Sequence, residues 1–204
     1  MDERLLTSLA YTALGYLSGG ILYAYLLPRL LRGIDVREGT DDHNPGGFNA
    51  VRACGLPLGV LCIVLDILKG TVPVLLAMRL GHVRDWYLVP VVLSPVIGHA
   101  WPLLLRGRGG KCISVSFGVL IALLPEILLG LFWAVAYLAL LPVVRDHRVL
   151  TRVSSLLMLA AAFLVYPMAY VRAIACGVTG ILQIKHRRRS PQEACQEPFG
   201  PQAA

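Results

Sequence analysis

The stretch CGLPLGVLCIVLDILKGTVPVLLAM, residues 54–78, indicates the class of the fold. It carries two charged side chains, Asp66 and Lys69, and is otherwise almost entirely apolar or small. A helix needs about 20 mainly apolar residues to cross the roughly 30 Å of bilayer hydrocarbon. The whole chain has a similar character, with 56% hydrophobic residues, 15% charged residues and a mean hydropathy of +0.67. Soluble domains carry about a quarter charged residues, so the sequence predicts an all-α integral membrane protein.

Together with this stretch, the chain contains seven apolar segments. Cys112–Val144 is too long for one straight span, and Pro125 near its middle predicts a tight turn. Val153–Ile184 is also too long, and we expect it to divide near Pro167. The predicted transmembrane helices are Leu5–Leu27, Cys54–Met78, Trp86–Leu105, Cys112–Leu124, Ile127–Val144, Val153–Tyr166 and Ala169–Ile184.

The basic residues predict the orientation of these helices. With seven spans, the segments 28–53, 106–111, 145–152 and 185–204 fall on one side and hold 14 of the 19 Lys and Arg residues. Basic loops remain cytoplasmic, so we expect the N-terminus outside and the C-terminus in the cytoplasm. The net charge of +7 then reflects topology, and nucleic acid is not an expected partner. We predict one membrane-embedded domain over residues 1–186, and over 187–204 a tail that is basic and then disordered.

The five cysteines do not form a recognisable site. They include no C-x-x-C pair and no histidine at ligand spacing. Neither a zinc site nor a disulfide framework is indicated, and we expect free thiols and no bound metal.

The stretch GHAWPLLLRGRGGK, residues 98–111, changes from apolar sequence to a turn of glycine, arginine and lysine. Backbone N–H groups in such a turn, the start of the next helix near Cys112, and the charges of Arg108 and Lys111 are the components of a phosphate-binding site. The stretch is not a nucleotide P-loop, because Leu105 stands where the first glycine is required. From the stretch alone, a cytoplasmic turn that happens to be rich in glycine is an equal alternative.

The first basic loop, residues 32–55, is the longest between predicted spans. It places Asn44, Gly46, Asn49 and Arg52 close together among several acidic residues. Glycine permits close approach of the backbone to a ligand, and an arginine with nearby amides suits phosphate or carboxylate. A solvated connector is the other interpretation of this loop.

Polar residues within the apolar segments have two interpretations. Asp66 and Lys69 are three residues apart and share one helix face, where they could form an ion pair that locks the helix or the polar floor of a site. His99, near the end of its segment, is either a packing residue or part of the same site.

Three ordered motifs resemble one family, the bacterial glycerol-3-phosphate acyltransferases that use acyl phosphate (PlsY). The stretch GHAWPLLLRGRGGK is similar to the family's GH-x-FP followed by a GGKG turn, LDILKGTVPVLLA to its second-span motif, and HNPGGFNAVRACG to its first-loop pattern. The resemblance extends from about Gly19 to His186.

The resemblance implies a specific reaction. The family transfers a fatty acyl group from acyl phosphate to the 1-hydroxyl of glycerol 3-phosphate, which yields lysophosphatidic acid and phosphate in phospholipid synthesis. It implies a multi-span protein of the bacterial cytoplasmic membrane, with both substrates and membrane lipid as partners, and no cofactor. We expect a monomer, and catalysis by positioning and electrostatics, with substrate phosphate taking the proton.

The resemblance also implies the site residues. The expected catalytic residues are Lys111, Arg52, Ser154 and His186. The expected substrate-binding residues are Asn44, Gly46, Asn49, His99, Gly109, Gly110, Arg108, Asp66 and Lys69, with Gly109 and Gly110 as backbone donors to phosphate.

Several positions depart from the family pattern. The first-loop serine is replaced by Asp42, a threonine by Phe48, and the last glycine of GGKG by Cys112; Arg188 and Arg189 replace an acid and an amide. Two further interpretations therefore stay open beside the expected reaction. One is the same chemistry on another acceptor, and the other is a non-catalytic homologue that binds lipid or a partner protein.

Overall fold

The computed structural model describes residues 2–38, 40 and 43–187, and every regular element among them is helical. The α-helices are α1 Glu3–Gly20, α2 Tyr23–Arg32, α3 Gly47–Cys54, α4 Leu56–Arg79, α5 Leu88–Ala100, α6 Ile113–Ile121, α7 Leu129–Leu140, α8 His147–Val165 and α9 Ala169–Lys185, with short 3₁₀ helices at Asp85–Tyr87 and Leu103–Leu105. The prediction of an all-α protein is confirmed.

Each predicted span corresponds to a helix or a pair of helices, but their lengths differ. Three helical segments are long and apolar enough to cross a membrane, namely Leu56–Arg79, Asp85–Leu105 and His147–Val165; a fourth is the pair α1 and α2, bent by 43°. Within the described residues, α6, α7 and α9 are shorter than this criterion requires. The turn expected near Pro125 separates α6 from α7, and the turn near Pro167 separates α8 from α9.

The first predicted span, Leu5–Leu27, is wrong as one continuous helix. The helix breaks after Gly20, where two adjacent glycines lower helix propensity. Gly19 packs directly on the backbone of Pro95, so α1 lies close against α5 before the break. The backbone carbonyl of Ile21 accepts a hydrogen bond from Lys69 Nζ at 2.6 Å, and this bond satisfies a group that the break exposes.

Helix α8 begins six residues before the predicted start at Val153. Asp146 caps it, since its carboxylate accepts a hydrogen bond from the Arg148 backbone N–H at 2.7 Å. The basic segment 145–152 is therefore mostly the first turns of a helix. Helix α5 is shorter than predicted, because Pro102 disfavours helical backbone at Trp101.

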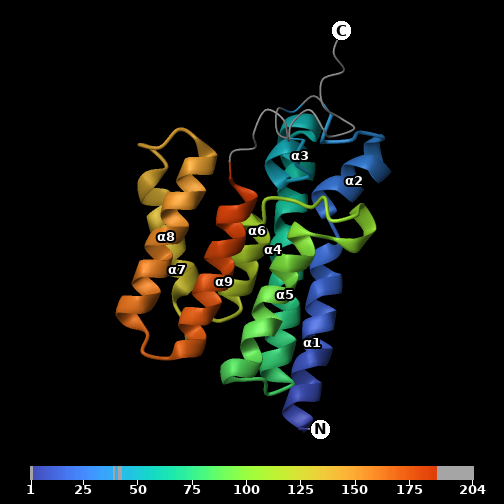
Figure 1. Cartoon of the computed structure of the whole chain (residues 1–204). Coiled ribbons are helices and arrows are strands. Elements are labelled where there is room, and N and C mark those ends of the chain that lie inside the picture. The colour runs from blue at the N-terminus through green and yellow to red at the C-terminus, as the bar shows by residue number, and fades with distance from the viewer. Residues whose placement is uncertain (1, 39, 41–42, 188–204) are drawn as a thin grey trace.

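The helices run between two ends of an elongated bundle (Figure 1). The N-terminal end of α1 and the turns between α4 and α5 and between α8 and α9 lie at the lower end. Helix α3, the loop before α6, the start of α8 and the end of α9 lie toward the upper end. The described parts of the four basic segments thus gather at one end of the molecule.

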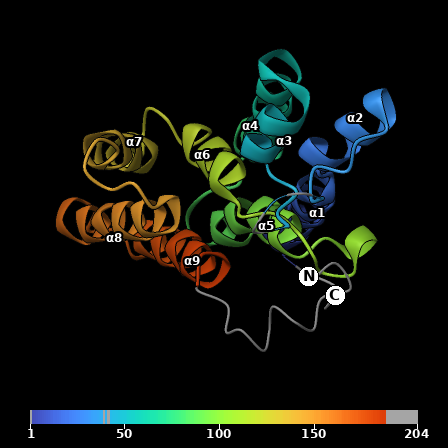
Figure 2. The ribbon, with the colours of Figure 1, turned by 90° about the horizontal axis from the view of Figure 1, so that it is seen from above.

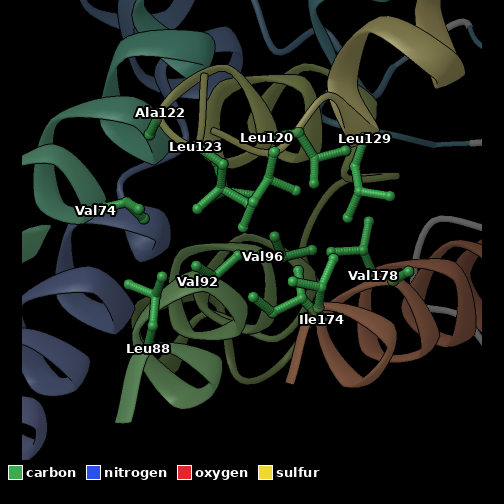
Figure 3. Packing of buried hydrophobic residues seen from close by; sticks show 14 of the residues in the cluster. Val74, Leu88, Val92, Val96, Leu120, Ala122, Leu123, Leu129, Ile174 and Val178 are labelled. Atoms are coloured by element: carbon green, nitrogen blue, oxygen red, sulfur yellow. The ribbon is translucent and has the colours of Figure 1, made fainter. Parts of the chain in front are cut away.

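One hydrophobic core joins α4 through α9. Val74, Val92, Leu120 and Ile174, from four different helices, are completely buried and belong to one cluster (Figure 3). Viewed from above, α6 lies between α4 and α7 (Figure 2), and it contacts both. The described cysteines, Cys54, Cys62, Cys112 and Cys176, are free thiols as predicted, and Cys195 lies outside the described residues.

Candidate active site

A cavity of about 510 Å³ lies between α3, α4, α6, α7 and α8, at the end where the basic segments gather. Polar and charged side chains from distant parts of the chain meet in its wall. Eight of the residues expected in a site line it, namely Asn44, Gly46, Asn49, Arg52, Asp66, His99, Lys111 and His186.

The N-terminal ends of three helices face this cavity. Its lining includes Gly47 of α3, Ile113 and Ser114 of α6, and His147 and Arg148 of α8. Asp146 caps α8, whereas α3 and α6 have no side-chain cap among residues 43–187. The first N–H groups of an uncapped helix and its positive dipole end favour an anion. The cavity therefore offers two helix ends of this kind.

Two cationic side chains add to this field. Lys111 immediately precedes the N-cap of α6, and Arg52 is in the last turn of the short helix α3; both line the cavity. Lysine supplies a compact positive charge, while arginine offers a planar set of donors that matches phosphate. Each uncapped helix end thus has a cation close to it along the chain.

The asparagines and Gly46 form the turn that leads into α3. Asn49 Nδ2 donates a hydrogen bond to the Asn44 carbonyl at 2.9 Å. A Cβ at Gly46 would overlap the Asn44 side-chain amide, so a larger residue there would displace this amide. This turn brings Asn44 to the cavity wall beside the start of the helix.

His186 contributes a neutral imidazole to the cavity. It is 2% exposed, and its Nδ1 donates to the Leu182 carbonyl at 2.9 Å. Burial and, to a smaller extent, the positive charges of Lys111, Arg148 and Lys185 lower the pKa of His186 to about 4, against a smaller rise from its hydrogen bond to Leu182. Its Nε2 is buried and has no hydrogen-bond partner among the described residues. At neutral pH this nitrogen is therefore an acceptor that a ligand hydroxyl can use.

His99 lies deeper, near the end of α5. It is 3% exposed, and its Nδ1 is buried without a hydrogen-bond partner among the described residues. The glycine turn folds back over it, since Gly110 packs against the imidazole. His99 therefore lines the cavity and also supports the turn that carries Lys111.

The expected role of Gly109 and Gly110 as donors to phosphate is wrong. The Gly109 N–H donates to the Ala100 carbonyl at 3.2 Å, and the Gly110 N–H donates to the His99 carbonyl at 3.0 Å. Neither residue lines the cavity. They are glycines for a steric reason, because a Cβ at either position would overlap His99 or its backbone carbonyl.

We expect Gly110→Ala to lower the free energy of unfolding by about 1–3 kcal/mol, because the added methyl group has no room beside His99. The matched control is Gly180→Ala in α9, where the new methyl group meets nothing within 4 Å. Alanine loses less conformational entropy than glycine when it is held in a helix, so Gly180→Ala should raise the free energy of unfolding by roughly 0.5–1 kcal/mol. Denaturant unfolding in one detergent would compare the two, and equal stability of Gly110→Ala and the parent would contradict this packing.

Three other expected site residues do not line the cavity. Arg108 is exposed. Lys69 Nζ contacts Asp66 Oδ1 at 2.7 Å and donates to the carbonyl of Ile21, so it links the cavity wall to the break between α1 and α2. Ser154 accepts a hydrogen bond from Trp133 Nε1 at 3.0 Å, between α8 and α7. A role of these residues at a substrate stays a prediction.

The sequence interpretation missed part of the wall. Tyr137, Asp146, His147 and Arg148 line the cavity, as do Thr40 and Ser114. The segment 145–152 had been interpreted through its charge alone. Asp146, directly before an amphipathic helix, was the available signal, since an aspartate at that position predicts the N-terminus of a helix.

Two of the positions that depart from the family pattern can be placed. Cys112 is the N-cap of α6 with a left-handed φ of 67°, a conformation that favours glycine. Phe48 is in the first turn of α3 and lines the cavity. Asp42, Arg188 and Arg189 lie outside the described residues.

Comparisons with known proteins identify the family of this chain. Residues 9–192 match the family described as glycerol-3-phosphate acyltransferase. Relatives of that name include one from Myxococcus xanthus, 41% identical over 152 residues that cover 74% of each chain. Another, from Lacticaseibacillus casei, is 32% identical over 176 residues that cover 85% of this chain and 82% of the relative.

Solved structures extend the similarity to the fold. The crystal structure of PlsY (YgiH), an integral membrane glycerol 3-phosphate acyltransferase, in its glycerol 3-phosphate form, has a TM-score of 0.79 and 27% identity over 88% of each chain. Its lysophosphatidic acid form has a TM-score of 0.76 and 26% identity. The sequence match, the shared fold and the apolar helices lead to one conclusion: this chain is a helical membrane protein that belongs to the glycerol-3-phosphate acyltransferase family.

Proposed function

We propose that this protein transfers a fatty acyl group from acyl phosphate to the 1-hydroxyl of glycerol 3-phosphate and releases phosphate and lysophosphatidic acid. The observation that carries the proposal is the cavity whose wall brings Lys111 and Arg52 together with the first residues of two helices that have no side-chain cap among residues 43–187. Both substrates bear a phosphate, and each helix end with its cation suits one of them.

Each of the two phosphates is assigned to one helix end and to the cation nearest to that end along the chain. Lys111 and the start of α6 hold the phosphate of the acyl donor and stabilise the charge that develops as it leaves. Arg52, Asn44, Asn49 and the start of α3 hold the phosphate of the acceptor. The acyl chain lies against the less polar wall, to which Ile63, Ile113 and Tyr137 contribute.

The acceptor hydroxyl is oriented by His186. Its oxygen bonds to the acyl carbonyl carbon while the bond from that carbon to the phosphate oxygen breaks. His186 Nε2 accepts the hydrogen bond of the bound hydroxyl before the reaction. As the new bond forms, the hydroxyl exchanges this hydrogen bond for one to an oxygen of the departing phosphate, which takes the proton. The chemistry requires positioning and electrostatic stabilisation and no cofactor.

In this proposal the protein is a monomer in a bacterial cytoplasmic membrane. It crosses the bilayer seven times as one domain over residues 1–186, with the N-terminus outside. The cavity and the tail from residue 187 then face the cytoplasm, where glycerol 3-phosphate and acyl phosphate are available.

Donor preference tests the proposal. Purified protein with radiolabelled glycerol 3-phosphate should form lysophosphatidic acid with palmitoyl phosphate. Palmitoyl-CoA and palmitoyl-acyl carrier protein should give no product above background, because the proposed donor site recognises a phosphate joined directly to the acyl group. Equal product from acyl-CoA would contradict the assignment of the donor.

Arg52→Ala should raise KM for glycerol 3-phosphate at least about tenfold, because a hydrogen bond between charged groups contributes about 1.5–3 kcal/mol. Initial rates at saturating acyl phosphate would measure it. Arg145→Ala is the control, since Arg145 is exposed and is not part of the cavity wall. An unchanged KM in Arg52→Ala would remove Arg52 from the acceptor site.

A further inference from the structure

An aromatic pair bridges the rim of the cavity. Phe48 in the first turn of α3 and His147 in the first turn of α8 have ring centroids 5.5 Å apart, with their planes tilted by 52°. Both residues line the cavity, although they are far apart in the sequence. Phe48 is 58% exposed, so its ring closes part of an opening and does not fill a core.

The same ring also contacts the cation assigned to the acceptor phosphate. The guanidinium carbon of Arg52 lies 5.3 Å from the centroid of Phe48, within the range of a cation–π interaction. Phe48 therefore contacts both His147 and Arg52. The ring limits the space beside whatever phosphate that arginine binds.

The surroundings of Phe48 identify the substrate that it would limit. Asn44, Asn49 and Arg52 belong to the same turn and helix as Phe48, and their amide and guanidinium groups suit a phosphate and its hydroxyls. The apolar side chains suited to an acyl chain, Ile63 and Ile113, come from α4 and α6. A bulky ring on α3 thus acts on the acceptor, and the family pattern has the smaller threonine at this position.

We propose that Phe48 and His147 determine the acceptor size that the site accepts. The pair leaves room for the phosphomonoester of a small polyol and excludes a phosphodiester with a second substituent on its phosphate. This inference rests on the proposed function, because it assumes that Arg52 holds the acceptor phosphate.

The test compares two acceptors in the purified full chain. The kcat/KM for glycerophosphoethanolamine, a phosphodiester, is divided by that for glycerol 3-phosphate. This ratio should rise at least about tenfold in Phe48→Ala, a change typical of a remodelled pocket. His147→Ala should also raise it, while His147→Phe, which keeps an aromatic ring on α8, should stay within about twofold of the parent. The preference between dodecanoyl and hexadecanoyl phosphate should not change.

An unchanged acceptor ratio in Phe48→Ala, in protein that elutes and melts like the parent, would overturn the inference. A shift in acyl-chain preference without a shift in acceptor ratio would also overturn it, because the ring would then act on the donor. If the parent does not acylate glycerol 3-phosphate, the proposed function fails first. The size limit is then judged by calorimetry: the parent should bind glycerol 3-phosphate and not the diester, and equal binding of both would overturn the inference.

Discussion

Lys111→Ala should lower kcat for lysophosphatidic acid formation by at least about 100-fold, the loss typical of removing one group that stabilises a developing charge. Lys111 lines the cavity and stands directly before the N-cap of α6, where the leaving phosphate is proposed to bind. The measurement is the initial rate at saturating concentrations of both substrates. A loss in kcat would separate stabilisation of the leaving group from simple binding of the donor.

Three controls accompany this variant. Lys111→Arg keeps the charge and should retain more activity than Lys111→Ala. Arg106→Gln removes a positive charge from an exposed residue outside the cavity wall and should leave kcat within about twofold of the parent. Cys112→Gly should preserve activity, because glycine adopts the φ of 67° at this position without strain. Equal activity of Lys111→Ala and the parent would remove the proposed donor site.

Lys69→Met should destabilise the folded protein by about 3–5 kcal/mol, the cost of leaving one member of a buried ion pair without its partner. The side chains of Lys69 and Asp66 are 1% and 2% exposed, and the pair also supplies the donor to Ile21 at the helix break. Reversible unfolding in mixed micelles would measure the loss. We expect it to exceed the effect of Gly110→Ala.

The double variant Asp66→Leu with Lys69→Met provides the matched control. Removal of both charges should recover most of the loss, because no uncompensated charge remains in the apolar interior. Leu68→Met changes the neighbouring, 45% exposed side chain and should have little effect. A loss below about 1 kcal/mol in Lys69→Met would show that the pair does not hold the break.

The membrane class and the order of the helices could be predicted because they depend on segment length, apolar composition and the distribution of charge. Pro125 and Pro167 divided two long apolar runs correctly, since proline interrupts the helical hydrogen-bond pattern. The break after Gly20 was missed although Gly19 and Gly20 weaken the helix there, because the bond that satisfies the exposed carbonyl comes from Lys69, which is distant in sequence. Local sequence does not reveal a hydrogen bond of that kind.

For the candidate site, most of the polar residues could be predicted, but the geometry of the glycine turn and the part played by α8 could not. The loop motifs indicated Asn44, Arg52 and Lys111, the family resemblance added His186, and all four line one cavity. The glycine turn was misinterpreted, because sequence cannot show that its N–H groups already bond to carbonyls at the end of α5. His147 was missed because its place in the wall follows from how α8 packs against the rest of the bundle.

The central claim is that one cavity brings two phosphate-bearing substrates together for acyl transfer. The most direct test measures released phosphate and lysophosphatidic acid in the same reaction, with purified protein, palmitoyl phosphate and glycerol 3-phosphate. We predict one phosphate for each lysophosphatidic acid, and release of phosphate that depends on the acceptor. The absence of both products from folded protein, or phosphate release at the same rate without glycerol 3-phosphate, would contradict the claim.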